Sequence, residues 1–516
     1  MNRIFWLIIF CFNFAQAQQF TRSELPTSLN IPWEITYGPD NYLWVSEAGG
    51  TVARLDPQDG SKTIIYTAPD YFGGSLLEQS PLCFNPTIGA GTLGLTLHPD
   101  FLNPDSSFIY FVYSYNQGTV SAPLTNFKIK RLTWNSPTNT VTNSVDLVDS
   151  ISTGYDHLGG RLLAIKQNGV SYLFLTIGDH GTSEDSSPTC YFPQSTNPNN
   201  FAQDPTTQNG KIHRFNMDGS IPSDNPIAGN SFYTRGHRNP QGLIYNSSLD
   251  ILYDLEHGDR TDDEINILYK GMNYGWKNVR GFHSDNNYPG EASYIASYVP
   301  DINIPNDSLV QPFYSFCATP PDVSNNYLDW CTVAPSDGVH YSSTAITEWT
   351  NSLLITTLKN GVSADCEVYQ FKLDANGSLI PSTFSNPNPK RFFGEDQALN
   401  GRLRDIAISP NGKKIYLINN FGSATDKITV YEYLEIDSTH GEQLWLYPNP
   451  SSEIVTIKFA DKLDVEEIQV LNTQGQTVYS SELNFATINT SSFSSGVYFI
   501  ELKTPKTKII RKYLKE

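Results

Sequence analysis

The stretches ITYGPDNYLWVSEAGG (residues 35–50) and LTLHPDFLNPDSSFIYFVYSYN (95–116) share one pattern. Each begins with an apolar run, turns at Pro, Asn or Gly, continues through a β-rich run and ends on polar residues. Four more copies are LLAIKQNGVSYLFLTIGDHG (162–181), LIYNSSLDILYDLEHG (243–258), AITEWTNSLLITTLKNG (345–361) and IAISPNGKKIYLINNFG (406–422). Apolar runs joined by such turns are typical of β-hairpins, so the pattern predicts six hairpins.

Six hairpins, separated by segments long enough to hold further strands, predict a six-bladed β-propeller. A β-helix fits less well because its repeat is far shorter. The composition agrees with an all-β protein, since aromatic residues make up 13% of the 516 residues and there are 36 Gly, 32 Pro and only 3 Met. The length leaves room for an extra module beside the propeller.

The charge of the chain restricts its partners. Asp and Glu number 53 against 34 Lys and Arg, which gives a formal net charge of −19. This excess of acidic groups argues against a nucleic-acid partner and could hold divalent cations, although on composition alone a solvated acidic surface is the favoured explanation.

The first 17 residues predict a signal peptide. A basic start is followed by the mostly apolar stretch 4–14 and by the small-x-small site Ala15-Gln16-Ala17. No later segment is long and apolar enough to be transmembrane, so we expect an exported protein in an oxidising compartment.

Five cysteines remain after cleavage: Cys83, Cys190, Cys317, Cys331 and Cys366. Cys317 and Cys331 flank a Pro-rich loop and form the pair most favoured for a disulfide. The odd count leaves at least one thiol unpaired in a monomer.

Titratable residues recur at two positions of the repeat. The hairpins end at Glu47, Asp179, Glu256, Lys359 and Asn420, and the segments before them hold His157, Arg238, Arg402 and Arg404. Equivalent positions of propeller blades form a ring around one axis. If both positions share a face, the sequence predicts one mouth lined by His157, Asp179, Arg238, Lys359, Arg402 and Arg404. The alternative is that each of these residues only caps a blade or closes a turn.

Several motifs carry a resemblance to a known family. These motifs are LNIPWEITYGPDNYLWVSE, LGLTLHPDF, DHLGGRL, TIGDHG, NGKIHRFNMDGSIPSDNP, GHRNPQGL, EHGDRTDDEINIL, GMNYGW, TVAPS and RLRDIAISPNG. Residues 29–433 resemble the soluble glucose and sorbosone dehydrogenases that depend on pyrroloquinoline quinone (PQQ). GHRNPQG followed by DDEIN and NYGW, in this order and at similar spacing, is the most specific part. The resemblance implies a six-bladed propeller, in agreement with the repeats.

The resemblance implies oxidation of the C1 hydroxyl of an aldose to a lactone, with hydride transfer to the quinone. In this family pattern His157 is the base that takes the hydroxyl proton. Asp179 orients His157 and stabilises its imidazolium form. Arg238 stabilises negative charge that develops at the reacting carbonyl.

The resemblance also assigns binding residues. The cofactor carries three carboxylates, which Lys359, Arg402 and Arg404 would oppose, with Asn239 and Thr332 adding neutral hydrogen bonds. A Ca²⁺ ion would bind the backbone carbonyls of Gly258 and Asp259 and polarise the quinone. Glu264 and Tyr274 match ligands of a further, structural calcium site, although DDEIN could equally be an acidic turn. Asp156, Tyr327 and Trp330 match residues of the sugar pocket.

The sugar-facing loops depart from the family pattern. CFNPTIGAGT (83–92) differs in length, TSEDSSPTCYFPQ (182–194) has no clear counterpart, and VSADCE (362–367) is additional. The sequence therefore predicts a quinoprotein dehydrogenase more firmly than it predicts glucose as the substrate. An alternative is a catalytically inactive propeller that serves in carbohydrate binding or adhesion. A calcium-dependent lactonase-type hydrolase has less support, because the cationic residues suit an anionic cofactor.

A separate module occupies residues 444–516. LWLYPNPSSEIVTIKF (444–459), VEEIQVLNTQGQTVYSS (465–481) and SSGVYFIELKTPKTKIIRKYLKE (494–516) alternate with period two and turn at Asn and Gly, which predicts a small antiparallel β-sandwich. The module resembles the C-terminal sorting domains of the type IX secretion system, although a carbohydrate-binding or adhesion module is an alternative. We expect residues 18–437 to form the propeller, 438–443 to be a linker, and the protein to be secreted or attached to the cell surface. The sugar and an external electron acceptor would be its other partners.

Overall fold

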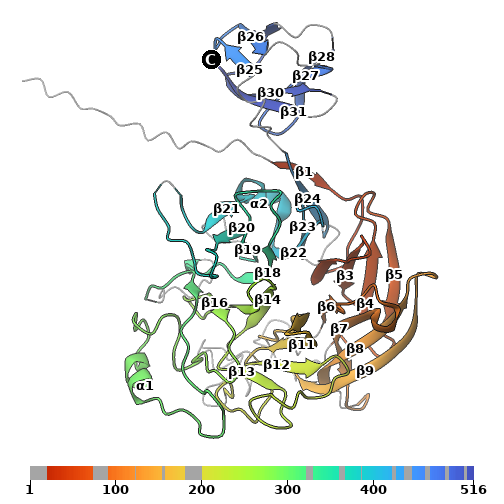
Figure 1. Cartoon of the computed structure of the whole chain (residues 1–516), viewed down its shortest axis with the longest axis vertical. Coiled ribbons are helices and arrows are strands. Elements are labelled where there is room, and N and C mark those ends of the chain that lie inside the picture. The colour runs from red at the N-terminus through yellow and green to blue at the C-terminus, as the bar shows by residue number, and fades with distance from the viewer. Residues whose placement is uncertain are drawn as a thin grey trace, which may run out of the picture. The chain divides into compact units, whose positions relative to one another are not determined.

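The computed structural model is all-β, with strands grouped into antiparallel sheets (Figure 1). It describes residues 20–73, 91–121, 124–153, 157–180, 200–320, 329–359, 366–384, 386–420, 426–434, 444–459, 465–482, 487–504 and 508–516. The predicted signal peptide (1–17), the linker (438–443), Asp156, Tyr327, Cys83 and Cys190 lie outside these ranges. The chain divides into one compact unit at Glu24–Val430 and a second that includes Tyr431–Glu516.

Six four-stranded sheets make up the first part of the fold. The first is β2 (Glu34–Tyr37), β3 (Leu43–Glu47), β4 (Thr51–Leu55) and β5 (Lys62–Thr67). The second is β6 (Thr92–Leu97), β7 (Phe108–Asn116), β8 (Thr125–Asn135) and β9 (Thr140–Ser152). The third is β10 (Leu162–Gln167), β11 (Val170–Ile177), β12 (Lys211–Asn216) and β13 (Phe232–Arg235).

The remaining three sheets repeat this order. The fourth is β14 (Pro240–Asn246), β15 (Ile251–Glu256), β16 (Glu264–Ile267) and β17 (Tyr314–Ser315). The fifth is β18 (Pro335–Tyr341), β19 (Ser352–Thr357), β20 (Val368–Lys372) and β21 (Lys390–Phe392). The sixth has the order β1-β24-β23-β22 and joins β1 (Phe20–Glu24) to β22 (Leu403–Ile408), β23 (Lys414–Asn419) and β24 (Ile428–Tyr433). Two short helices, α1 (Glu291–Ser297) and α2 (Gln397–Asn400), lie between strands.

The sheets succeed one another around a common centre (Figure 1). Their first strands contact each other in the order β2, β6, β10, β14, β18 and β22, and β22 in turn contacts β2. Buried apolar clusters fill the spaces between neighbouring sheets. One joins β7 to β11, a second joins β3 to β23, and a third joins β15 to β19. Burial of these faces is the main force that holds the sheets side by side.

Five of the six predicted hairpins are confirmed. The remaining one, which was predicted at residues 345–361, is displaced. Its first strand is β18 rather than residues 345–350. Those residues form a turn, in which the backbone N–H groups of Trp349 and Thr350 donate to the Ile346 carbonyl at 2.8 and 3.1 Å. Ile346 and Trp349 lie three residues apart, so the turn buries both of them without a strand. The predicted Cys317–Cys331 disulfide is present.

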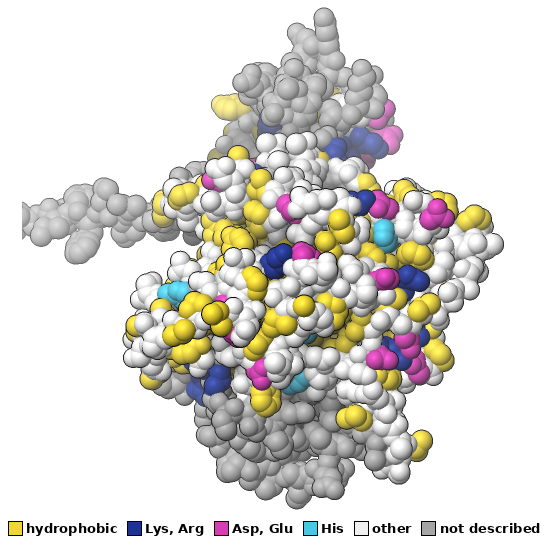
Figure 2. Space-filling view, turned by 60° about the horizontal axis from the view of Figure 1, so that its bottom comes forward, with side chains coloured by type: hydrophobic (Ala, Val, Ile, Leu, Met, Phe, Trp, Pro, Cys, Tyr) yellow, Lys and Arg dark blue, Asp and Glu magenta, His cyan; other side chains and the backbone are white. Residues whose placement is uncertain are grey.

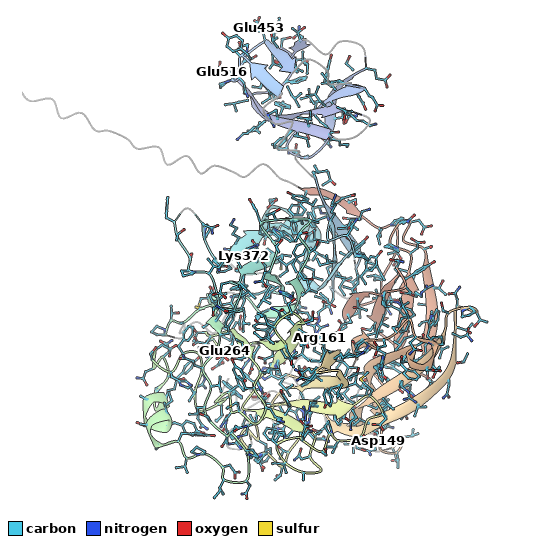
Figure 3. The ribbon with its side chains drawn as sticks, in the orientation of Figure 1. Asp149, Arg161, Glu264, Lys372, Glu453 and Glu516 are labelled. Atoms are coloured by element: carbon cyan, nitrogen blue, oxygen red, sulfur yellow. A yellow bond between two sulfur atoms is a disulfide. The ribbon has the colours of Figure 1, made fainter. Side chains whose placement is uncertain are left out.

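Arg161 lies near the centre of the ring of sheets (Figure 3). Its Nη1 atom pairs with the carboxylates of Glu34, of Asp337 at 3.0 Å and of Asp405 at 3.5 Å. Its Nε atom donates to the Gln241 carbonyl at 3.0 Å. These partners come from β2, β18, β22 and β14. A single buried guanidinium therefore connects the first strands of four sheets.

The second unit has its own core. A three-stranded sheet has the order β25-β26-β29 and a four-stranded sheet has the order β28-β27-β30-β31. Its strands are β25 (Leu444–Tyr447), β26 (Ile454–Phe459), β27 (Glu467–Leu471), β28 (Thr477–Ser481), β29 (Thr487–Asn489), β30 (Gly496–Lys503) and β31 (Lys508–Lys515). Side chains of both sheets meet in one buried apolar cluster. Among the described residues of the whole chain, no helix has the length and apolarity needed to cross a membrane.

The Glu34 carboxyl makes stability depend on pH. Burial, partly offset by Arg161, raises its pKa from 4.5 to about 7. The folded state then binds this proton more tightly than the unfolded state, so the contribution is complete below pH 4.5 and is lost as the pH rises through about 7. Between pH 4.5 and about 7 the unfolding free energy of the wild type should fall because Glu34 loses its proton. We expect this fall to be smaller in Glu34→Gln, by at most about 3 kcal/mol. Urea unfolding at several pH values measures it. Glu24→Gln, at an exposed pair with Lys427, is the control that should keep the wild-type slope; an unchanged slope in Glu34→Gln would contradict the assignment.

Candidate active site

An imidazole–carboxylate pair forms the centre of the candidate site. The Nδ1 atom of His157, in the loop before β10, lies 2.7 Å from Oδ1 of Asp179, which follows β11. Since Nδ1–H donates to this carboxylate, the lone pair of the neutral ring lies on Nε2. His157 has a backbone φ of +47°, in the left-handed region that non-glycine residues seldom adopt. Such strain clusters at functional sites.

Asp179 is fully buried and held on both oxygens. Its Oδ2 atom accepts hydrogen bonds from Trp276 Nε1 at 2.7 Å and from Asn200 Nδ2 at 2.9 Å. Burial alone would raise the pKa of Asp179, but the attraction and hydrogen bond of His157 and the charge of Arg238 hold that pKa well below its ordinary value. The carboxylate thus remains ionised and can stabilise a protonated His157.

Gly178 allows three chain segments to meet at this pair. A Cβ atom at this position would lie 2.0 Å from the His157 carbonyl oxygen and 3.0 Å from that of Arg238. The next backbone N–H, that of Asp179, donates to the Arg238 carbonyl at 2.8 Å. Only glycine fits here, and its small size brings the predicted base and the predicted arginine to one place.

Arg238 is positioned through backbone and side-chain contacts. Its Nη1 atom donates to the His257 carbonyl at 3.2 Å, and its guanidinium lies 5.4 Å from the Trp276 ring centroid. Its backbone N–H donates to Glu256, whose other oxygen accepts from His237 Nδ1 at 2.9 Å. Burial would lower the pKa of His237, but the carboxylates of Glu256 and Asp254 raise it to about 9. A buried ion pair therefore fixes the segment between β13 and β14 that carries Arg238.

Arg404 lies on β22 and is buried, whereas Arg402 precedes the strand and is exposed. Arg404 Nη2 donates to Gln241 Oε1 at 3.0 Å, and its guanidinium lies 4.1 Å from the centroid of the Trp33 ring. The buried Nε atoms of Arg404 and Arg238 have no hydrogen-bond partner within the described part of the chain. Buried guanidinium groups with an unused donor suit an anionic ligand.

Thr332, before β18, and Lys359, after β19, meet at one end of the fifth sheet. Lys359 Nζ donates to the Thr332 carbonyl at 2.7 Å and also to the Trp330 carbonyl. The adjoining segment is held by Asp263, which accepts from the backbone N–H groups of Val333 and Ala334, each at 2.7 Å. The other oxygen of Asp263 accepts from Gly258 N–H at 2.8 Å. One carboxylate thus ties the lysine segment to the predicted calcium bend.

The predicted calcium bend is a tight backbone turn. A Cβ atom at Gly258 would lie 2.0 Å from the Thr261 carbonyl oxygen and 2.4 Å from that of Asp262. Asp259 is buried, and its Oδ2 atom accepts from Tyr288 at 3.5 Å. The Thr261 and Asp262 carbonyls therefore lie against Gly258, and backbone carbonyl oxygens are among the ligands that Ca²⁺ takes.

Glu264 and Tyr274 are both buried, and each is held by its own set of contacts. Glu264 accepts from Gly281 N–H at 2.7 Å, and burial followed by the charge of Glu256 raises its pKa well above the ordinary value. The Tyr274 hydroxyl donates to the Ile267 carbonyl at 2.5 Å, and its ring stacks on His237 with centroids 4.7 Å apart. Of the predicted sugar-pocket residues, only Trp330 is described, and Arg260 lies 5.3 Å from its ring centroid.

The structure thus connects most of the predicted site residues. Hydrogen bonds link His157 to Asp179 and Asp179 to Arg238 directly, and they join Arg238, Asn239 and Arg404 through His257 and Gln241. Lys359 bonds to Thr332, and Asp263 joins Gly258 to the segment that follows Thr332. Sequence reasoning missed four residues that hold this set: Trp33, Gln241, His257 and Trp276. All four lie inside the motifs quoted above, and three of them lie within two residues of a predicted residue, so position within a motif was the signal that could have found them.

The chain resembles known proteins over both parts. The sequence profile of the glucose / sorbosone dehydrogenase family matches residues 29–426, and the profile of the secretion system C-terminal sorting domain matches residues 445–516. Quinoprotein glucose dehydrogenase B of Acinetobacter calcoaceticus is 31% identical over 464 residues, which cover 80% of this chain and 88% of that protein. An aldose sugar dehydrogenase of Escherichia coli is 30% identical over 259 residues, covering 49% of this chain and 60% of that protein.

Solved structures share the fold. The PQQ-bound form of aldose sugar dehydrogenase from Streptomyces coelicolor has a TM-score of 0.55 at 21% identity and covers 81% of this chain and 99% of its own. The apo-form of soluble aldose sugar dehydrogenase from Escherichia coli has a TM-score of 0.55 at 23% identity, with coverage of 80% and 99%. The family profile spans most of the chain and includes every described residue of the site around His157. The chain therefore belongs to the glucose / sorbosone dehydrogenase family of oxidoreductases and carries a secretion-system sorting domain at residues 445–516.

Proposed function

We propose that this protein is an exported, PQQ- and calcium-dependent dehydrogenase that oxidises the C1 hydroxyl of an aldose to a lactone. The observation that carries the proposal is the buried His157–Asp179 pair beside Arg238, held together by Gly178. A base, a carboxylate that stabilises its protonated form and a guanidinium are the groups that proton removal from a sugar hydroxyl requires.

The residues present fit an anionic quinone. Arg404 and Arg238 each have a buried Nε atom with no partner among the described residues, and Lys359 adds a third cation held at a defined place. Exposed Arg402 contributes charge at the same strand end, since burial, Arg161 and Arg402 together lower the pKa of Arg404. These groups would hold the three carboxylates of PQQ, with Asn239 and Thr332 as neutral partners.

The residues also fit calcium beside the cofactor. The tight bend at Gly258 leaves no room for a side chain, and Asp263 fixes the bend through the Gly258 N–H. The carbonyls of Gly258 and Asp259 would then face one ligand, and the buried Asp259 carboxylate adds negative charge nearby. Glu264 and Tyr274 would contribute to a second, structural calcium site.

In the proposed reaction the chain moves one proton and orients the sugar. His157 Nε2 takes the C1 hydroxyl proton while Asp179, on Nδ1, stabilises the imidazolium that results. Arg238 stabilises the negative charge that develops as the C1–H bond breaks. When bound, PQQ with Ca²⁺ would accept the hydride that leaves C1, and an external acceptor would later remove the electrons. Trp330, Tyr327 and Asp156 would line the sugar pocket.

We propose that each of the six four-stranded sheets formed by β1–β24 is one blade of a six-bladed propeller over residues 18–437. The contact of β22 with β2 supports this arrangement, as does the pairing of β1 with β24 in the last sheet. Residues 444–516 would form a β-sandwich after the linker 438–443, and residues 1–17 would be removed as a signal peptide. The sorting domain supports delivery by the type IX machinery to the cell surface or the medium.

On the face drawn in Figure 2 acidic side chains lie beside basic ones, as on an ordinary solvated surface.

Reconstitution tests the activity. Purified protein with PQQ and Ca²⁺ should reduce an artificial electron acceptor when aldoses are added, and the quinone absorbance should shift on binding. Chelation of calcium before loading should prevent activity. A protein that binds no PQQ and oxidises no aldose would instead support the carbohydrate-binding or adhesion function.

Removal of the base separates chemistry from binding. We expect His157→Ala to lower kcat by at least about a hundredfold, because general-base catalysis contributes about 10²–10⁴-fold. Cofactor affinity should change little, since His157 serves the sugar hydroxyl. Absorbance titration with PQQ measures affinity, and steady-state assays measure kcat. Loss of PQQ binding in this variant would contradict the assigned role.

Removal of residues 444–516 tests the sorting module. The truncated chain should keep its kcat and KM in vitro, because the module has its own apolar core. It should remain inside the producing cells, as measured by fractionation of cells and medium. An inactive truncated protein would show that the module belongs to the catalytic unit.

A further inference from the structure

A chain of four hydrogen bonds connects residues of the candidate site from Arg404 to Pro335. Arg404 Nη2 donates to Gln241 Oε1 at 3.0 Å, and Gln241 Nε2 donates to Asn239 Oδ1 at 2.7 Å. Asn239 Nδ2 lies 3.3 Å from His257 Nδ1, and His257 Nε2 lies 2.9 Å from the Pro335 carbonyl oxygen. We refer to these five residues as the relay. It joins β22, β14, the segment after β15 and the start of β18.

The direction of every bond in the relay is fixed by its two ends. A guanidinium can only donate and a carbonyl oxygen can only accept. Arg404 therefore turns the oxygen of Gln241 toward itself, which turns the Gln241 NH₂ group toward Asn239. At the other end the Pro335 carbonyl requires a proton on His257 Nε2, so Nδ1 accepts from the Asn239 NH₂ group. The two requirements meet at Asn239 and agree on one amide orientation.

The relay touches several proposed ligand-binding groups at once. Arg404 and Asn239 are members of it, and the His257 carbonyl accepts from Arg238 Nη1 at 3.2 Å. The His257 backbone N–H donates to the Asn239 carbonyl at 3.1 Å, and Gly258 follows directly in the chain. His257 thus holds the catalytic arginine, the amide and the calcium bend in one arrangement. Gln241 holds Arg404 through its side chain, and its backbone carbonyl accepts from Arg161 at the ring centre.

We propose that Gln241 and His257 are positioning residues, which orient Arg404 and Asn239 toward the cofactor by setting the direction of the relay. This inference rests on the proposed function, because it assumes that the anion at Arg404 and Asn239 is PQQ. Neither residue needs to touch the sugar or the quinone. Their effect reaches the cofactor only through their neighbours, so the four bonds should behave as one unit.

A double-mutant cycle tests the relay. The variants are Gln241→Leu, His257→Leu, the double variant and His257→Gln. A glutamine can accept from Asn239 and donate to Pro335, so it preserves the direction of the relay. His213→Leu is the matched control, because His213 also bonds on both nitrogens, to Ser231 Oγ at 2.9 Å and to the Gln208 carbonyl at 2.7 Å, on β12. Titration of each apo protein with PQQ at saturating Ca²⁺ gives Kd from the quinone absorbance.

We expect each single leucine variant to weaken PQQ binding about tenfold, as loss of support for one charged hydrogen bond predicts. In the double variant PQQ binding should also be weakened about tenfold, because either single substitution already interrupts the whole relay and a second one removes nothing further. His257→Gln should stay within about threefold of wild type, and so should His213→Leu. Single-variant effects that multiply to about a hundredfold, or a His257→Gln as weak as His257→Leu, would overturn the relay. An equal loss in His213→Leu would mean that the change reports general destabilisation.

The same experiments distinguish failure of the proposed function from failure of the relay. Wild-type protein that binds no PQQ contradicts that function and the assignment of the relay to cofactor positioning. Urea unfolding of the same apo variants then still measures the coupling between Gln241 and His257. A coupling of zero shows that the four bonds do not act together. Wild-type protein that binds PQQ, with variants that bind equally well, overturns the relay alone.

Discussion

Charge compensation at the centre of the ring is the constraint on which the site depends. Arg161 is buried and faces three carboxylates, from β2, β18 and β22. An unpaired buried charge costs several kcal/mol, and these strands present carboxyl groups to the buried guanidinium. Burial raises the pKa of all three carboxyl groups, so the cluster need not carry three negative charges around one positive charge. The strands that meet in this way also carry the groups of the candidate site. Arg161 lies four residues after His157, and Arg404 directly precedes Asp405.

The same arrangement explains why Arg404 can serve a ligand. The central carboxylates pair with Arg161, while Arg404 is held by the amide of Gln241 and the face of Trp33. A second buried cation thus lies beside the cluster with an unused Nε donor. Charge that is fixed in place before a ligand arrives lowers the cost of binding and needs little reorganisation during the reaction. The charge of Asp179 beside His157 is likewise fixed in advance, since Trp276 and Asn200 already orient its ionised carboxylate.

Tight backbone approaches complete the site. Gly178 lets the segments of His157 and Arg238 meet, and Gly258 folds the bend proposed to hold calcium. Both glycines lie just after the second strand of a hairpin, Gly178 after β11 and Gly258 after β15. The third and fourth hairpins therefore supply rigid frames, and the residues that follow them supply groups of the candidate site. This division would let the loops that depart from the family pattern vary while the proposed catalytic groups stay in place.

The sequence by itself determined the all-β class, the hairpins, the disulfide and the residues that the site brings together, because local apolar periodicity and motif order carry that information. It placed the fifth hairpin wrongly, since Ile346 and Trp349 are buried by a turn that only the packing around them defines. It also missed Gln241, His257 and Trp276, whose partners lie far away in the chain. Only the tertiary structure decides which distant donor faces which acceptor. Hydrogen-bond direction depends on both ends at once, and no single stretch of sequence contains both.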